Sequence, residues 1–104
     1  MGKNMNNLLK QAQQMQQKMS TLQKELEARE LETSSGGGMI KVKINGKQEI
    51  LDVTLNQECL DSGDVEMISE IIKVGINQAI KESQDMVSSA MSKITGGINI
   101  PGLF

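Results

Sequence analysis

Apolar residues recur at spacings of three and four along the first quarter of the chain. They occupy the a and d positions of consecutive heptads: Met5, Leu8, Ala12, Met15, Met19, Leu22 and Leu26. No Gly or Pro lies between Lys3 and Arg29, and most residues there are good helix formers. The pattern therefore predicts a helix over about residues 4–28. We call its apolar stripe the heptad seam, and so narrow a stripe is typical of a helix that packs against another long helix.

The hydrophobic pattern changes to a period of two after three consecutive glycines. Apolar residues alternate with lysines over Ile40–Asn45, which predicts a strand with one dry and one wet face. The pair Asn45-Gly46 suits a type I′ hairpin turn, because both residues tolerate positive φ. If residue 44 pairs with residue 47, the apolar residues of 40–44 and 51–55 share one face of the hairpin.

A third strand is expected before the glycines, where Leu31 and Thr33 alternate with polar residues. The sheet would then be antiparallel and three-stranded, over about residues 30–55. The run Gly36–Gly38 is expected to be either a bulge or a place where another backbone approaches too closely for side chains. A bare hairpin is unstable alone, so we expect the flanking helices to cover its apolar face.

A second long helix is expected over about residues 64–94, following a connector and ending at Gly96-Gly97. Candidate caps for its N-terminus are Asp61, Ser62 and Asp64. Its apolar residues lie on more than one side, so this helix can cover the sheet and still reach a second protomer. An apolar tail over residues 95–104 completes the chain.

The totals favour an oligomer. A length of 104 residues corresponds to one domain or one protomer. Phe104 is the single aromatic residue among 38% apolar residues, which is little for a monomeric core. Together with the heptads, this predicts a homodimer, the commonest assembly. The residues expected at its interface are Met5, Leu8, Met15, Met19, Leu22, Ile76 and Ile80.

Charge is unevenly distributed along the chain. The net charge is −2, yet residues 1–24 carry four lysines and no acidic residue. Lys3, Lys10 and Lys24 share the f position, opposite the heptad seam. Lysines suit phosphate contacts, whereas single-strand binding needs aromatic residues that are missing here. From the residues alone, the alternative is that these lysines lie on an ordinary solvated helix face and bind nothing. The candidate DNA contacts are Lys3, Lys10, Lys18, Lys24, Lys41 and Lys43.

The sequence offers little for catalysis. Histidine is absent, and Cys59 has no second Cys or His with which to form a nucleophile pair or a metal site. We expect no enzymatic activity, no cofactor, no metal and no small-molecule substrate. The single cysteine fits a reducing compartment, and no apolar run approaches the roughly 18 residues of a membrane span. A cytoplasmic protein without a membrane partner is expected.

The order of these elements resembles the YbaB/EbfC family of bacterial nucleoid-associated proteins. The resemblance covers nearly the whole chain and rests on these features: the basic heptad helix, Ser34-Ser35 before Gly36–Gly38, the hairpin Met39–Lys47, the segment Val74–Ala79, Thr95-Gly96-Gly97 and Ile100–Phe104. It implies an α+β protomer ordered α-β-β-β-α, with two long helices flanking the sheet. It also implies an intertwined, tweezer-like homodimer that binds double-stranded DNA in the nucleoid and organises DNA or regulates genes.

The charge of the chain lowers the expected affinity for DNA, and the order of its elements leaves a second interpretation open. The pI is about 5.1, and Arg29 is the only arginine, which departs from a strongly basic DNA-binding surface. Two long helices flanking a hairpin also describe a prefoldin-like chaperone or structural interaction protein. Such a protein would use the heptad seam and the apolar tail.

Overall fold

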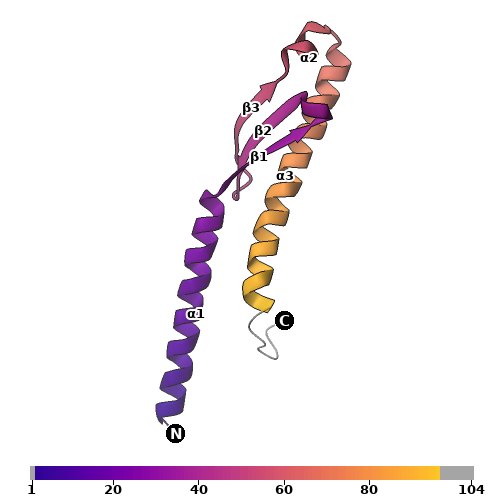
Figure 1. Ribbon diagram of the computed structural model, residues 1–104. Coiled ribbons are helices and arrows are strands. Elements are labelled where there is room, and N and C mark those ends of the chain that lie inside the picture. Colours follow the sequence, from indigo (N-terminus) through magenta and orange to yellow (C-terminus); the bar gives the residue numbers. More distant parts are fainter. Residues whose placement is uncertain (1, 97–104) are drawn as a thin grey trace.

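The protomer has the predicted order of elements (Figure 1). The computed structural model describes residues 2–96, and the side chains of residues 5–93. The elements are α1 (Gly2–Ala28), β1 (Glu30–Ser35), the glycine turn η1 (Gly36–Gly38), β2 (Ile40–Asn45), β3 (Ile50–Leu55), α2 (Gln57–Asp61) and α3 (Val65–Gly96). The α+β class and the α-β-β-β-α order are confirmed, with the short helix α2 added inside the predicted connector.

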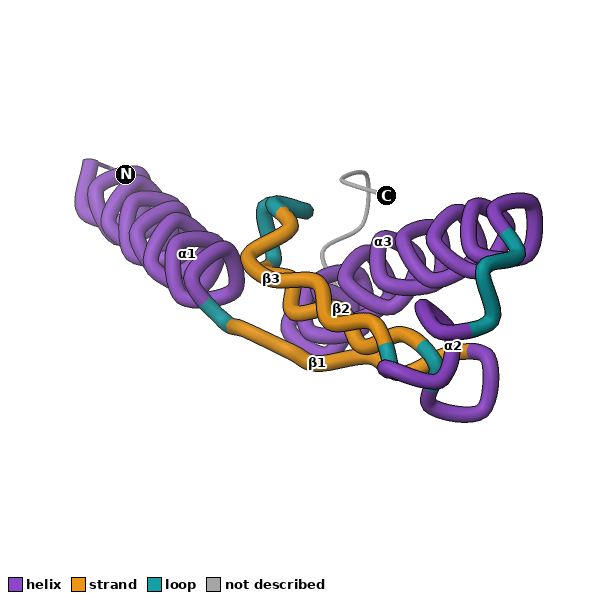
Figure 2. Tube along the Cα trace, turned by 90° about the horizontal axis from the view of Figure 1, so that it is seen from above, coloured by secondary structure: helices purple, strands orange, loops and turns teal. Residues whose placement is uncertain are grey.

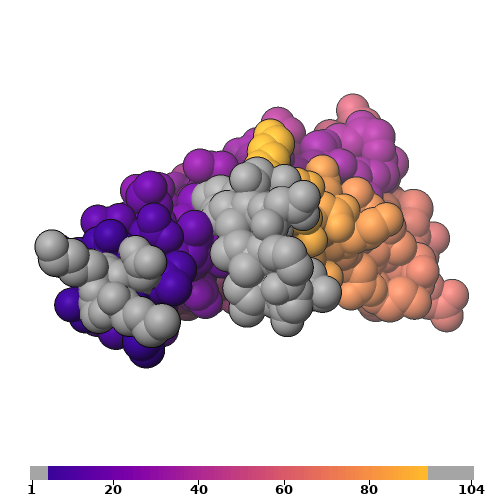
Figure 3. Space-filling model, turned by 90° about the horizontal axis from the view of Figure 1, so that it is seen from below, coloured from indigo at the N-terminus to yellow at the C-terminus, as the bar shows by residue number. Residues whose placement is uncertain are grey.

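The protomer is strongly elongated. Its extents are 74 × 21 × 16 Å and its radius of gyration is 20.5 Å, whereas a compact domain of this length has a radius of about 13 Å. Figure 1 shows the cause: α1 leaves one end of the sheet as a projecting arm, while α3 runs along the sheet and beyond it. Viewed from below, α1 and α3 lie on opposite sides of the molecule (Figure 3).

The three strands form an antiparallel sheet in the order β1-β2-β3. One face is covered by α3, which packs on β1 and β2 (Figure 2). Core residues from both layers meet there: Ile40, Val42, Ile44 and Ala79, with Leu31, Leu55, Ile71, Ile76 and Ile80 around them. Gly75 permits the close packing, since a Cβ at this position would lie 2.6 Å from Cγ2 of Ile40.

The predicted register of the β2–β3 hairpin is wrong. Ile40 pairs with Leu55 and Val42 with Val53, whereas a two-residue turn would place residue 40 opposite 51. The observed loop is wider because the Asn45 side chain organises it: its Oδ1 accepts the backbone N–H groups of Lys47 (2.9 Å) and Glu49 (3.1 Å). A bulge beside Lys43 and Ile44 completes the shift.

The predicted roles of the glycines also need correction. Positive φ in the hairpin loop occurs at Gln48, not at Asn45 or Gly46, so the turn is not type I′. Gly46 is required instead for close approach, because a Cβ there would lie 1.9 Å from the carbonyl oxygen of Leu26. Within the protomer, Gly36–Gly38 form neither a bulge nor a close approach. They make the β1–β2 turn with φ of 63°, 67° and 91°, a region that glycine enters without a steric cost.

The N-terminal end of α3 follows a predicted signal. Asp64 is the cap among the three candidates, since its Oδ1 accepts the backbone N–H of Met67 at 3.0 Å. The predicted apolar tail begins inside α3, and from residue 97 onward it lies outside the described residues.

Candidate nucleic-acid interface

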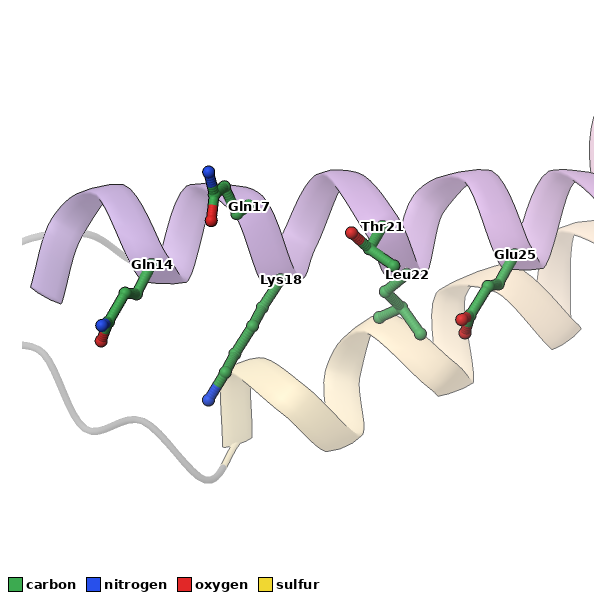
Figure 4. Close-up of a pocket in the computed structure, with 6 residues that line it drawn as sticks. All are labelled: Gln14, Gln17, Lys18, Thr21, Leu22 and Glu25. Carbon is green, nitrogen blue, oxygen red and sulfur yellow. The ribbon is translucent and has the colours of Figure 1, made fainter.

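The heptad seam of α1 is covered only in part. Leu26 is fully buried, Met15, Met19 and Leu22 are half-buried, and Met5 and Leu8 are 67% and 64% exposed. Burial therefore declines toward the free end of the arm. Among the described residues, α1 contacts β2 and α3 of the same protomer, and Leu22 of the seam points toward α3 in Figure 4.

The lysines of α1 lie on two different sides of the helix. Lys10 and Lys24 are exposed at the f position, which lies opposite the seam. Figure 4 shows Lys18, together with Gln14, Leu22 and Glu25, on the side of α1 that faces α3. These residues line an open cavity of about 610 Å³. The side chain of Lys3 lies outside the described residues.

Lys10, Lys18 and Lys24 are free to meet an external anion. Over residues 5–93, the salt bridges are Lys43–Glu30 at 3.8 Å and Lys73–Glu70 at 3.4 Å, and neither involves α1. Exposed ammonium groups without an acidic partner can form charge-assisted hydrogen bonds with a ligand such as a phosphate.

The two sheet lysines differ from each other. Both are exposed on the outer face of β2, but Lys43 lies opposite Glu32 on β1 and Asp52 on β3 and also pairs with Glu30. Lys41 lies opposite Ser34 and Thr54, which are neutral. Facing charges on neighbouring strands offset one another, so Lys41 is the more available of the two.

One cationic side chain near the arm escaped the sequence-based prediction. Lys47, in the β2–β3 loop, lines an open cavity of about 270 Å³ at the end of α1 together with Lys24, Glu27, Ala28, Asn45 and Glu49. No periodicity links residue 47 to residue 24. Their proximity depends on the contact between the loop and α1, which only the fold reveals.

Neither a metal site nor a membrane span is found within the described part of the chain. Residues 2–96 contain no helix apolar and long enough to cross a bilayer. In the same range, no three His, Cys, Asp or Glu side chains converge as metal ligands would. The structure is an elongated α+β protomer with a projecting, lysine-bearing helix.

Comparison with known proteins identifies the family. The profile of the YbaB/EbfC DNA-binding family matches residues 1–98, and the chain belongs to this family. A nucleoid-associated protein of Desulforamulus reducens is 50% identical over 104 residues, covering 100% of this chain and 99% of the relative. One from Caldanaerobacter subterraneus subsp. tengcongensis is 46% identical over 103 residues, covering 99% and 93%.

A solved structure shares the fold. The crystal structure of an uncharacterized protein from Helicobacter pylori aligns with a TM-score of 0.70 and 22% identity, covering 86% of this chain and 94% of the other. The resemblance inferred from the sequence is thus confirmed at the level of family and fold.

Proposed function

We propose that this protein binds double-stranded DNA in the nucleoid as a homodimer, through phosphate contacts made by lysines of α1 with little sequence specificity. One observation carries the proposal. In a member of a DNA-binding family, Lys10 and Lys24 stand exposed on a projecting helix, and within residues 5–93 neither forms an ion pair.

The residue types favour backbone contacts over base readout. Lysine offers a point charge suited to phosphates, while bidentate readout of guanine most often uses arginine, and Arg29 is the only one here. Lys10 and Lys24 are separated by about 21 Å along the helix, which corresponds to roughly six base pairs along one strand. The two lysines are therefore far enough apart to meet different phosphates of the same duplex.

The uncovered surface of β3 supports the homodimer. Ile50, Leu51 and Val53 are between 38% and 45% exposed, because α3 covers β1 and β2 and leaves β3 at the edge of the sheet. Apolar edge strands require a cover in a soluble protein. A second copy of this chain is the proposed cover, and Met5 and Leu8 at the free end of the seam add to the same interface.

The dimer surface proposed from the structure adds residues to the one predicted from the sequence. Ile76 and Ile80 pack in part against the sheet core within the protomer, and their remaining surface is available to a partner. The residues of β3 join them in the proposal. Met15, Met19 and Leu22 remain half-buried and can gain further cover from a second protomer.

A titration of duplex DNA at two salt concentrations tests the function. Fluorescence anisotropy at 50 and 200 mM salt would compare the wild type, the double variant Lys10→Gln/Lys24→Gln and the control Lys73→Gln. Affinity should fall about 3.5-fold over this interval for each phosphate contacted. A dimer of the double variant loses four lysines. The slope of its log affinity against log salt concentration (the log–log slope) should therefore be shallower by up to about 3.6. Lys73 already pairs with Glu70, so its replacement should leave the slope unchanged.

Two results would contradict the proposal. The first is a wild-type protein that shows no binding to duplex DNA at 50 mM salt. The second is a double variant whose affinity and slope match those of Lys73→Gln.

The exposed end of the heptad seam favours a second candidate, a chaperone-like interaction with apolar segments of other proteins. Met5, Leu8 and Leu9 are all well exposed there. Suppression of aggregation of an unfolded client in DNA-free solution, lost in Met5→Gln/Leu8→Gln, would support it. Such activity without any affinity for DNA would reverse the order of the two candidates.

A further inference from the structure

The β2–β3 loop brings a lysine to the end of the arm. The backbone N–H of Gly46 donates to the carbonyl oxygen of Arg29 at 3.1 Å, and the missing side chain of Gly46 lets the loop lie against α1. Lys47 follows directly, and it lines the same open cavity as Lys24. Figure 1 shows the loop between β2 and β3 beside the last turn of α1.

The two lysines at this junction are available to an external anion. The carboxylates that line the cavity are engaged by neutral amides: Glu27 Oε1 accepts from Gln23 Nε2 at 3.5 Å, and Glu49 Oε1 accepts from Asn45 Nδ2 at 3.1 Å. In the stretch 5–93, no salt bridge involves Lys24 or Lys47. Neither ammonium group is therefore held in an ion pair within this stretch.

The balance of charge at the junction selects the kind of anion. Two lysines and two glutamates line the cavity, so its net charge is zero and a small free anion gains little by entering it. A phosphate of a polyanion already held by Lys10 and Lys24 is different, because the neighbouring contacts supply its local concentration. A duplex backbone that follows the outer face of α1 reaches this junction at its end.

We propose that Lys47 is a further DNA-contacting residue, and that with Lys24 it binds the duplex backbone where α1 meets the β2–β3 loop. This inference rests on the proposed function, since it extends the same binding surface. The surface then runs from Lys10 through Lys24 onto the sheet, and it includes a loop residue that the heptad pattern does not mark.

Three single variants test the role of Lys47 in the same anisotropy titration. Lys47→Gln removes two lysines from a dimer, so its log–log slope should be shallower by up to about 1.8. The factor by which its affinity falls between 50 and 200 mM salt should then be about 12 times smaller than the factor for the wild type. Lys24→Gln should behave in the same way, while Lys73→Gln, which removes the same charge far from the junction, should match the wild type.

A change of opposite sign at the same loop gives an independent readout. Glu49→Gln keeps a side chain that can accept from Asn45 but removes a carboxylate from the cavity, so this variant should bind duplex DNA more tightly than the wild type. Inorganic phosphate at the same ionic strength should compete no better than chloride, because the cavity alone is not an anion site.

The outcomes separate the inference from the function on which it rests. A shallower slope for Lys24→Gln combined with wild-type behaviour for Lys47→Gln overturns the inference and leaves DNA binding by α1 intact. Equal losses for Lys47→Gln and Lys73→Gln indicate a general effect of net charge and overturn it too. A wild-type protein that fails to bind at 50 mM salt removes the proposed function itself.

Discussion

Gly46 lies so close to Leu26 that a Cβ at residue 46 would stand 1.9 Å from the carbonyl oxygen of Leu26. This contact joins the β2–β3 loop to the last turns of α1, and with it the arm to the sheet. The obstructing atom belongs to the backbone of a helix, which cannot move aside as a flexible side chain can. The direction of the arm therefore depends on the absence of a side chain at one position.

Replacing Gly46 by Ala should destabilise the protein by about 1–3 kcal/mol, the usual cost of overpacking. Gly46→Asn should be at least as harmful, because the obstacle is steric. Gly37 is the matched control: it has a φ of 67°, and a Cβ added there would meet only open space. Asn tolerates that conformation, so Gly37→Asn should be nearly neutral. Urea unfolding at one fixed protein concentration measures all three, and a neutral Gly46→Asn would contradict the steric account.

Ser83 ties the same loop to α3. Its Oγ donates to the backbone carbonyl oxygen of Asn45 at 2.7 Å, and the side chain is fully buried. The carbonyl oxygen also accepts the N–H of Gln48 at 3.0 Å, so it keeps one partner in Ser83→Ala. The expected loss is therefore about 1 kcal/mol, the cost of one hydrogen bond without a stranded acceptor.

Chemical denaturation of Ser83→Ala beside Ser88→Ala checks this value. Ser88 lies exposed on the same helix, so its replacement controls for the change in helix propensity. Equal unfolding free energies for the two variants would show that the buried hydrogen bond contributes nothing.

The elements could be predicted from the sequence because their signals are local. Heptads in α1, alternation in β2 and the three candidate caps of α3 each involve residues within a few positions of one another. The hairpin register could not, because it depends on the hydrogen bonds of the Asn45 side chain. Lys47 was missed for a related reason: its position beside Lys24 depends on the contact of Gly46 with α1.

Coverage of apolar surfaces was predictable only in outline. The wide apolar face of α3 correctly indicated a helix that covers the sheet. Periodicity could not tell which strands it covers, so the exposure of β3 and the packing of Ile76 and Ile80 against the sheet core emerged only from the fold.

Asp64 should matter both as a hydrogen-bond acceptor and as a charge at the N-terminus of α3. Its Oδ1 accepts the N–H of Met67, and loss of such a cap in Asp64→Ala costs about 1 kcal/mol. Asp64→Asn keeps the acceptor and removes only the interaction with the helix dipole, worth about 0.3–1 kcal/mol. Thermal unfolding should therefore rank the wild type above Asp64→Asn and Asp64→Ala last. The reverse order for the two variants would show that the charge matters more than the hydrogen bond.

The uncovered strand β3 gives the most direct test of the homodimer. Val53 pairs with Val42 and shares its face of the sheet, yet it remains exposed because α3 does not reach it. Thr54 is its neighbour on the opposite face, where it lies across from Lys41. Val53→Glu places a charge on the proposed interface, whereas Thr54→Glu adds the same charge beside a lysine and outside that interface.

Sedimentation equilibrium should give the wild type and Thr54→Glu twice the chain mass of 11.4 kDa at micromolar concentration. Val53→Glu should shift toward a single chain, because burial of an unpaired carboxylate costs several kcal/mol. Val53 is not part of the sheet core beneath α3, so circular dichroism should show that the helices of Val53→Glu remain folded. A wild type of one chain mass would reject the dimer. A dimeric Val53→Glu would move the interface away from β3, toward the half-buried methionines of the seam.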